Sequence, residues 1–359
     1  MIIEIDILTL DFTLGGGIER VVSNMAWMFA KHPEYKIRIV SAFHKEHEIK
    51  FPIPDNVEVL FLSDNQYDLT SLWKKVTSNI KLANCVKHYS SDALIISTTT
   101  NITQWLSILG KANKQKVIAA EHAYYWAFGW FSRMMRKITY RKVYAVVTLT
   151  KSEVKVYDDF VNTVVSIPNS LSFTTNIQND YTSKRVIAAG RAVKEKGFDQ
   201  LLDIYAVLAT KHKDWSFVLF SGEGYLLDYL KEKVVKCPSN VRLYPATKQF
   251  QKELLDSEIY VCTSSTESFS MVIVEAMSCG VCPVSYKCPP GPMEIIDDGI
   301  NGILVDLNDK EMMIERLDYL INNRNERMVL GKRAKNDSLN YSSDNIYKSW
   351  DNLIKLLTP

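Results

Sequence analysis

The sequence predicts an α/β protein made of two doubly wound domains, each built on a parallel sheet. Short apolar strands alternate with helical segments along nearly the whole chain. A polar stretch without periodicity, Pro168–Lys184, interrupts this alternation, which then restarts. The length of 359 residues suits two domains of ordinary size, and 47% apolar residues allow each to bury a core.

In the first half, the turn Gly15–Gly17 follows the first expected strand. Ile18, Val21, Met25 and Phe29 then recur at helical spacing, which predicts a helix directly after the glycines. The strands that we expect in this half are Ile2–Leu10, Lys36–Phe43, Ala93–Ser97, Val117–Ala120, Ala145–Leu149 and Val164–Ile167.

The second half repeats the pattern. The expected strands are Val186–Gly190, Trp215–Ser221, Val241–Tyr244, Ile259–Thr263, Val281–Ser285 and Ile303–Val305, with helices such as Phe198–Lys211 and Met271–Cys279 between them. Three helical segments end the chain, the last over Asn345–Leu357. We therefore expect domains over residues 1–168 and 169–340, and a final helix within 341–359 that packs back towards the first domain. Two such halves imply a cleft between them, where ligands commonly bind.

Charge and composition exclude several classes of protein. The formal charge of +2 argues against a protein that coats nucleic acid. The first six residues carry two carboxylates instead of a secretory signal, and no apolar run approaches the ~20 residues that span a bilayer. We expect a cytoplasmic protein. The pair Cys279-x-x-Cys282 has no second pair or histidine cluster beside it, so we expect reduced core cysteines and no metal.

Two places in the sequence offer an anion-binding turn. Gly15–Gly17 lets a ligand approach the backbone at a helix N-terminus, although plain turn geometry needs glycine too. Arg191 ends a strand after Gly190, and Lys196 precedes Gly197 at the start of the next helix. These two cations are either solvated loop residues or a diphosphate clamp; we favour the clamp because both flank glycines at a strand–helix junction.

The segment 264–280 carries two carboxylates around a helix start. Glu267 lies in the loop after an expected strand, and Glu275 lies early in the helix that begins near Ser270. Ionised carboxylates suit adjacent sugar hydroxyls, because each accepts more than one hydrogen bond. The alternative makes Glu267 a helix cap and Glu275 a surface charge. The apolar neighbours of Glu275 disfavour that alternative.

These residues together resemble the retaining glycosyltransferases of family 4, the glycosyl transferases group 1, which have the two-Rossmann GT-B fold. The resemblance rests on motifs in a fixed order along the chain: Gly15–Arg20, Glu121-His122, Ile167–Ser170, Gly190-Arg191 with Lys196-Gly197, Ser221–Gly224, Glu267 with Glu275, and Gly291–Gly302. It implies an acceptor-binding domain over residues 1–168 and a nucleotide-sugar-binding domain over 169–340, facing each other across a cleft.

The resemblance also implies a role for each matching residue. Arg191 and Lys196 would hold the donor diphosphate, Glu275 the ribose, and Glu267 the transferred sugar. The loop residues Ser268, Phe269, Ser270 and Met271 would lie beside the donor, with Ser270 standing where many relatives have glycine. Gly16, Gly17 and His122 would approach the sugar or phosphate from the first domain, although His122 is equally compatible with a packed core histidine. Gly222, Tyr244 and Ala246 would line the base.

The implied reaction is transfer of a hexose or N-acetylhexosamine, with retention and without a metal or cofactor, to a glycan or lipid-linked acceptor for cell-surface polysaccharide or glycan assembly. The segment Cys288–Pro292 favours UDP as the nucleotide. Two alternatives remain at this stage. A nucleotide-sugar epimerase of the same fold would need the clamp but no acceptor cleft, and a non-catalytic nucleotide-sugar-binding subunit would lose site residues.

An aromatic and basic stretch follows His122. Aromatic residues crowd residues 124–131, and Arg133, Arg136, Lys137, Arg141 and Lys142 follow without an acidic residue. Such a helix suits either an anionic membrane surface or a core helix with a solvated basic side, and both interpretations stay open.

Overall fold

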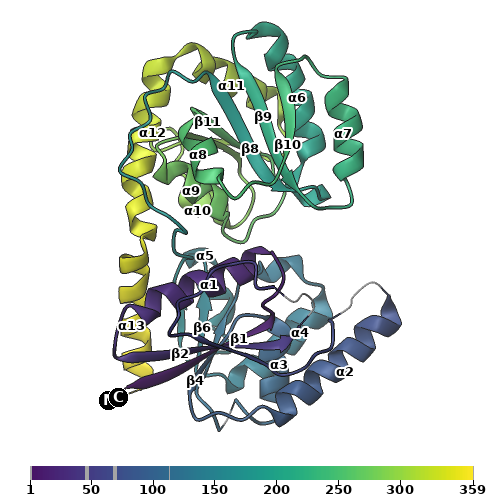
Figure 1. Cartoon of the computed structure of the whole chain (residues 1–359), viewed down its shortest axis with the longest axis vertical. Helices are drawn as coiled ribbons and strands as arrows, with labels where there is room; N and C mark the ends of the chain where they lie inside the picture. Colours follow the sequence, from purple (N-terminus) through teal and green to yellow (C-terminus); the bar gives the residue numbers. More distant parts are fainter. Residues whose placement is uncertain (1, 45–47, 68–70, 113, 359) are drawn as a thin grey trace. The chain divides into compact units, whose positions relative to one another are not determined.

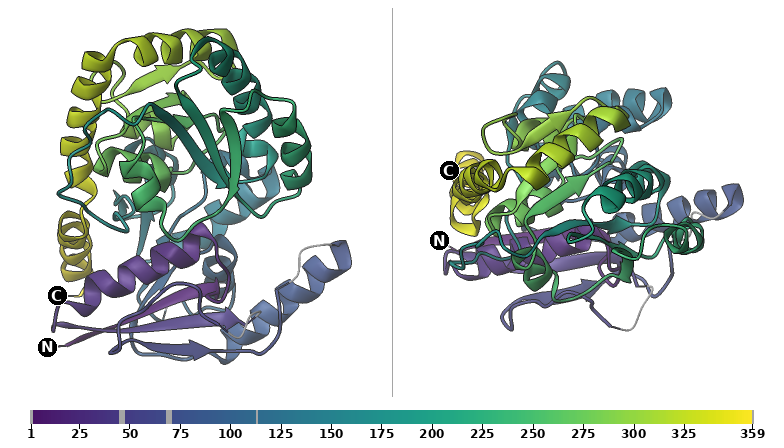
Figure 2. Two further views of the ribbon diagram at one scale, coloured as in Figure 1. Left: turned by 45° about the horizontal axis from the view of Figure 1, so that its top comes forward. Right: turned by 90° about the horizontal axis from the view of Figure 1, so that it is seen from above.

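The computed structural model describes residues 2–44, 48–67, 71–112 and 114–358. They form two compact units, called unit 1 (residues 2–170 and 343–358) and unit 2 (residues 171–342) (Figure 1). Each unit is an open parallel sheet with helices on both of its faces (Figure 2). The predicted fold class is confirmed.

The sheet of unit 1 has the strand order β3-β2-β1-β4-β5-β6-β7, and every pairing in it is parallel. Its strands are β1 (Ile3–Asp11), β2 (Tyr35–Phe43), β3 (Glu58–Phe61), β4 (Leu94–Ser97), β5 (Val117–Ala120), β6 (Ala145–Thr148) and β7 (Val164–Ser166). The edge strand β3 was not predicted. Its four side chains are exposed or only half-buried, so its sequence lacks the buried run that identifies the other strands.

Helices cover both faces of this sheet. They are α1 (Gly17–Ala30), α2 (Leu72–His88), α3 (Thr100–Ile108), α4 (Trp130–Thr139), α5 (Lys151–Tyr157) and α13 (Ser343–Leu357). Successive residues of β2 point to opposite faces of the sheet and so pack in two different cores. Ile39 packs in the core with α1 and α13, whereas Val40 packs in the core with α2 and α3. The chain end belongs to unit 1 because α13 packs on α1, where the Trp350 and Phe29 rings lie 6.3 Å apart.

Unit 2 has the strand order β10-β9-β8-β11-β12-β13, again all parallel. Its strands are β8 (Arg185–Arg191), β9 (Ser216–Gly222), β10 (Val241–Pro245), β11 (Ile259–Cys262), β12 (Cys282–Tyr286) and β13 (Ile303–Val305). Its helices are α6 (Phe198–Lys211), α7 (Leu227–Val235), α8 (Phe250–Leu255), α9 (Met271–Ser278), α10 (Gly291–Ile295), α11 (Lys310–Asn322) and α12 (Arg324–Ser338).

The strand order reverses once in each sheet. In unit 1 the chain leaves β1 towards β2 and returns to its other side at β4; in unit 2 the same reversal lies between β8 and β11. The loops that follow the two strands diverge there, and ligands of such sheets bind at this point beyond the carboxyl ends of the strands. The topology therefore points to the loops after β1 and β4 and after β8 and β11.

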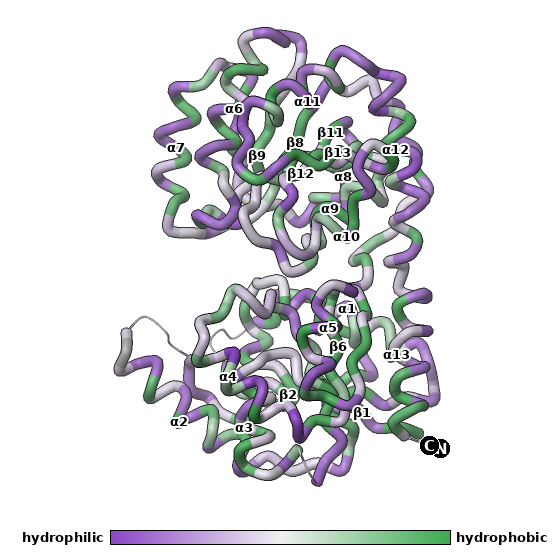
Figure 3. The backbone as a smooth tube through the Cα atoms, turned by 180° about the vertical axis from the view of Figure 1, so that it is seen from behind, coloured by the Kyte–Doolittle hydropathy of each residue, from purple (hydrophilic) through white to green (hydrophobic). Residues whose placement is uncertain are grey.

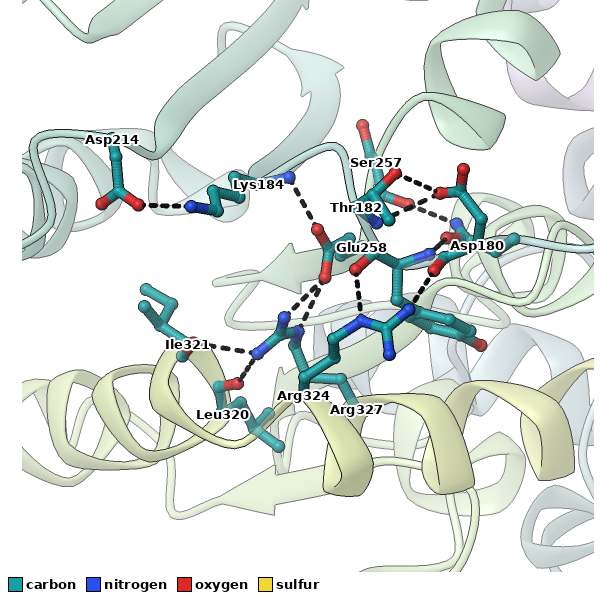
Figure 4. A network of polar contacts seen from close by, with 12 residues as sticks. Asp180, Thr182, Lys184, Asp214, Ser257, Glu258, Leu320, Ile321, Arg324 and Arg327 are labelled. Atoms are coloured by element: carbon teal, nitrogen blue, oxygen red, sulfur yellow. Dashed lines mark hydrogen bonds and ion pairs between the residues drawn. The ribbon is translucent and has the colours of Figure 1, made fainter.

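A buried ion pair fastens the start of unit 2 to α12 (Figure 4). Glu258 is fully buried and accepts hydrogen bonds from Arg327 at 2.7 and 2.9 Å and from the backbone N–H of Lys184 at 2.6 Å. Arg327 also donates to backbone carbonyls at the end of α11, so each charge is well satisfied. The neighbouring Lys184–Asp214 pair is exposed by comparison.

Breaking this pair should cost much of the stability of unit 2. Arg327→Met leaves Glu258 charged and buried, which we expect to lower the free energy of unfolding by about 3–5 kcal/mol. Asp214→Asn removes only a solvent-screened pair and should have little effect. Urea unfolding of the three proteins measures this, and equal losses from the two substitutions would contradict the assignment. Adding Glu258→Leu to Arg327→Met should restore most of the loss.

Candidate functional site

The loop after β8 lies tightly against the end of β11 in unit 2. Gly197 has a φ of 63°, and a Cβ atom there would lie 2.3 Å from the carbonyl oxygen of Thr263. The Thr263 hydroxyl donates to the carbonyl of Lys196 at 2.9 Å. Only glycine allows this approach. The sequence singled out Gly197 as a marker of the loop but did not identify Thr263, which fixes the loop in place.

Lys196 and Glu267, predicted from separate motifs, form an ion pair. The Lys196 Nζ lies 2.5 Å from Oε1 of Glu267, and the Ser264 hydroxyl donates to the same oxygen at 2.7 Å. Burial alone would lower the pKa of Lys196, but the Glu267 charge outweighs it and the pKa is raised. The ammonium is therefore charged, and it lies where the strand order reverses.

Arg191 is the second predicted cation of this site, and it is exposed at the end of β8. Among the residues that the structure describes, no carboxylate forms an ion pair with it. Its charge opposes protonation of Lys196, so the two cations act on one another. An anion placed between them would relieve this repulsion.

The Glu267 loop is bonded to the segment that follows β12. The backbone N–H of Gly291 donates to the carbonyl of Glu267 at 3.0 Å, and the N–H of Glu267 donates to Pro289 at 3.3 Å. A Cβ atom on Gly291 would lie 2.4 Å from the carbonyl oxygen of Phe269. The structure thus brings the segment Cys288–Pro292 beside the Glu267 loop.

Helix α9 begins from a strained residue. Ser270 precedes it with a φ of 70°, a left-handed conformation that costs a serine roughly 1–2 kcal/mol. Glycine would adopt this conformation without that cost, so serine at this position is the costlier residue. Glu275 lies in α9 and is fully buried, so the interpretation of Glu275 as a surface charge is wrong.

The residues predicted to line the base lie at the ends of the two strands beyond β8. Gly222 ends β9, and Tyr244 lies near the end of β10. A Cβ atom on Gly222 would lie 3.8 Å from the Cβ of Ala246. The Tyr244 ring is partly exposed and stacks on Phe220 at 5.5 Å. By strand order these residues lie on the opposite side of Arg191 from Glu267.

In unit 1 the three glycines form the turn between β1 and α1. The backbone N–H of Gly16 donates to Glu19 Oε2 at 2.9 Å, and a Cβ atom on Gly16 would meet that oxygen at 2.6 Å. A Cβ atom on Gly17 would have no heavy atom within 4 Å. Gly16 therefore shapes the turn through Glu19, to which we assigned no role from the sequence, and Gly17 faces open space.

His122 follows β5 in the same unit. Both of its ring nitrogens are buried, and none of the described residues hydrogen-bonds to either. The ring borders a cavity of about 10 Å³, room for about one water molecule, which Val21, Met25 and residues 167–170 also line. Burial lowers the pKa of His122 to about 4. The imidazole is therefore neutral at pH 7.

The predicted basic face of α4 needs correction at Arg136. This side chain is fully buried; its Nη2 lies 3.3 Å from Glu121 and donates to the Thr100 hydroxyl at 2.7 Å. A guanidinium with these partners cannot reach a surface. The core-helix alternative is wrong as well, because Phe131 and Ile138 are 59% and 56% exposed.

Within residues 2–44, 48–67, 71–112 and 114–358, no group of three or more His, Cys, Asp or Glu could hold a metal ion. All six cysteines are free thiols, and Cys279 and Cys282 are buried in the core.

Among the described helices, none combines the length and hydrophobicity that crossing a bilayer requires.

Comparison with known proteins relates the chain to glycosyltransferases. Residues 174–337, nearly all of unit 2, match the family Glycosyl transferases group 1. The chain is 26% identical over 346 residues to an uncharacterized glycosyltransferase of Haemophilus influenzae, covering 94% of this chain and 96% of that protein. The group 1 glycosyl transferase match therefore lies in unit 2, and this relative of nearly the whole chain is a glycosyltransferase.

Two further glycosyltransferases extend the match. The chain is 26% identical over 351 residues to the Campylobacter jejuni protein named GalNAc-alpha-(1->4)-GalNAc-alpha-(1->3)-diNAcBac-PP-undecaprenol alpha-1,4-N-acetyl-D-galactosaminyltransferase, covering 94% of this chain and 95% of that one. The structure of the pneumococcal O-GlcNAc transferase GtfA, in complex with UDP and GlcNAc, superposes with a TM-score of 0.80 at 14% identity over 99% of both chains. The fold is that of the GT-B glycosyltransferases.

Gly17 offers a test of the glycine turn in this glycosyltransferase. Gly17→Ala adds a methyl group into open space, so the melting temperature should not change. If a ligand approaches this backbone, kcat/KM for sugar transfer should fall roughly tenfold or more. Gly129→Ala is the control, because Gly129 lies directly before a helix and likewise has open space where a Cβ atom would be added. If Gly17→Ala transfers sugar as the parent does, no ligand approaches the backbone at Gly17 and the assignment of Gly17 to the site is wrong.

Proposed function

We propose that this glycosyltransferase transfers a hexose or N-acetylhexosamine from a UDP-sugar to a hydroxyl of a glycan or lipid-linked acceptor. The transfer proceeds with retention and without a metal ion, in the assembly of cell-surface polysaccharide or glycan. The observation that carries the proposal is the meeting of Arg191, Lys196 and Glu267 at the strand-order reversal of unit 2. A cation pair beside a carboxylate suits a diphosphate joined to a sugar.

The cations stabilise the leaving group. Negative charge builds on the departing UDP as the glycosidic bond breaks, and Arg191 and Lys196 are oriented before the reaction begins. The Lys196 ammonium is already desolvated against Glu267, which strengthens its interaction with a phosphate oxygen. These two charges take the part that a metal ion has in other nucleotide-sugar enzymes.

Glu267 acts on the sugar. Its contacts with Lys196 and Ser264 both use Oε1, and we assign Oε2 to the sugar. The carboxylate then stabilises the positive charge that develops on the ring. The acceptor oxygen approaches from the side of the leaving group, where a phosphate oxygen takes its proton, and the anomeric configuration is retained. Glu275, Gly222, Tyr244 and Ala246 hold the ribose and the base.

The donor and acceptor classes draw on the similar proteins. The pneumococcal transferase was solved with UDP and GlcNAc, which supports UDP as the nucleotide here. The Campylobacter jejuni protein is named for an acceptor that ends in PP-undecaprenol, which supports a lipid-linked acceptor. We infer that the enzyme works at the cytoplasmic face of a membrane.

A panel of nucleotide sugars tests the proposal directly. The protein is incubated with each donor, with and without EDTA, and released nucleotide is measured. UDP should be released from one donor in both conditions. When a glycan or lipid-linked acceptor is added, the anomeric proton of the glycoside formed should show the donor configuration. Conversion of the sugar without acceptor would instead indicate an epimerase, and no release from any donor would indicate a binding subunit.

The two glutamates should differ in their kinetic effect. The ribose changes little during transfer, so Glu275→Gln should raise the donor KM more than it lowers kcat. The sugar ring gains charge in the transition state, so Glu267→Gln should mainly lower kcat. Calorimetry without acceptor should give weaker donor binding only for Glu275→Gln. The reverse pattern would exchange the two roles.

Replacing Arg191 tests whether the diphosphate clamp depends on this residue or only on the total positive charge of the loop. Arg191→Ala should remove about 2–4 kcal/mol of transition-state stabilisation, measured as a fall in kcat/KM. Lys194→Ala is the control, since Lys194 is an exposed cation of the same loop without an assigned role. Neither substitution should change the melting temperature. Equal activity of the two variants would contradict the clamp.

A further inference from the structure

One segment of unit 1 is rich in basic residues. Residues 71–150 hold twelve of the 43 Lys+Arg of the chain but only two of its 41 Asp+Glu, Asp92 and Glu121. Glu121 is buried against Arg136 and does not offset the surface. This segment contains α2, α3 and α4, so a chain of nearly neutral total charge carries a strongly basic region.

Exposed apolar side chains lie within this basic region on α2. Trp73, Val76 and Ile80 are 82%, 52% and 63% exposed and recur at a spacing that places them along one side of the helix. The N-terminal half of α2 extends away from the rest of its unit in both views of Figure 2. Lys74 and Lys75 lie beside these side chains and are exposed. Burying a tryptophan is favourable, so its exposure suggests an apolar environment outside the chain.

Helix α4 repeats the combination. Trp130, Phe131 and Ile138 are 70%, 59% and 56% exposed, and Lys137 and Arg141 are exposed beside them. The helix is firmly held, because its one buried cation, Arg136, is fixed by Glu121 and Thr100. With Arg136 held inside the unit, the exposed apolar side chains of α4 lie on the outer side of the helix.

Helices α2 and α4 flank the same helix, α3. Helix α3 packs against both α2 and α4, on the same side of the sheet. Hydrophobic and hydrophilic residues alternate along α2 in Figure 3, where α2, α3 and α4 lie next to one another. We call the exposed side chains of α2 and α4, together with Arg141 in the turn directly after α4, the aromatic-basic face.

We propose that the aromatic-basic face binds the surface of an anionic bilayer, with α2 and α4 acting together. Tryptophan and phenylalanine insert at the level of the headgroups, while lysine and arginine pair with acidic lipids. Exposed tryptophan and phenylalanine beside lysine and arginine, with almost no acidic side chain in the segment, are the combination that suits an anionic lipid surface. The proposal deepens the proposed function by naming the surface that meets a lipid-linked acceptor.

Sedimentation with vesicles tests the charge. The parent should bind vesicles of equimolar phosphatidylcholine and phosphatidylglycerol, bind those of phosphatidylcholine alone far less, and lose binding as salt rises. The test variant combines Lys74→Gln, Lys75→Gln, Lys137→Gln and Arg141→Gln. Each charge near the surface is worth roughly fivefold in affinity, so we expect at least about a hundredfold loss.

The control variant makes the same change in net charge on unit 2. It combines Lys213→Gln, Lys236→Gln, Lys252→Gln and Lys332→Gln, all at exposed positions. It should bind anionic vesicles almost as the parent does. Equal losses in the two variants would mean that only net charge matters, and the proposal would be wrong.

Tryptophan quenching tests insertion. Brominated acyl chains should quench the fluorescence of the parent, and Trp73→Ala with Trp130→Ala should remove most of the quenching. The proposal would be overturned if the parent did not bind anionic vesicles. It would also be overturned if the parent formed a dimer without lipid and these substitutions dissociated that dimer. Donor hydrolysis without acceptor should be unchanged in all of these variants. Loss of vesicle binding with intact hydrolysis, or the converse, therefore separates this proposal from the proposed function.

Discussion

The close approach of the loop after β8 to the end of β11 is the constraint on which the site depends. The strand order reverses here, so the two loops would diverge without a specific contact. Gly197 supplies it, since its left-handed backbone lies against the Thr263 carbonyl where no side chain fits. The contact sets Lys196 beside Glu267. A cation and a carboxylate from distant parts of the chain thereby become one site.

The ion pairs of the chain differ in how completely they are satisfied, and this difference separates structure from function. Glu258 and Arg327 are buried and hydrogen-bonded on several sides, so a ligand would gain nothing by competing with them. Lys196 and Glu267 are partly exposed. A partly exposed pair at the carboxyl end of a sheet can exchange partners with a ligand, and a saturated buried pair cannot.

The sequence predicted the strands well wherever they are buried, because parallel strands covered on both faces form continuous apolar runs. The edge strand β3, with one exposed and three half-buried side chains, was missed, whereas the half-buried edge strand β7 was predicted. Local sequence also suggested a buried Glu275, through its apolar neighbours. It could not predict that Arg136 is buried, because a buried arginine and a surface arginine look alike until their partners are known. Glu121 and Thr100 meet Arg136 only through tertiary packing.

The correction at Arg136 changes what the charges of α4 mean. With Arg136 inside the unit, the helix has a fixed orientation, and Lys137 and Arg141 lie on the outside with Trp130. Because basic residues gather in residues 71–150, the remainder of the chain carries more acidic than basic side chains. An anionic surface would attract the first region and repel the second. Total charge therefore says little about whether an anionic membrane attracts this protein, because acidic side chains elsewhere in the chain offset the basic residues of 71–150.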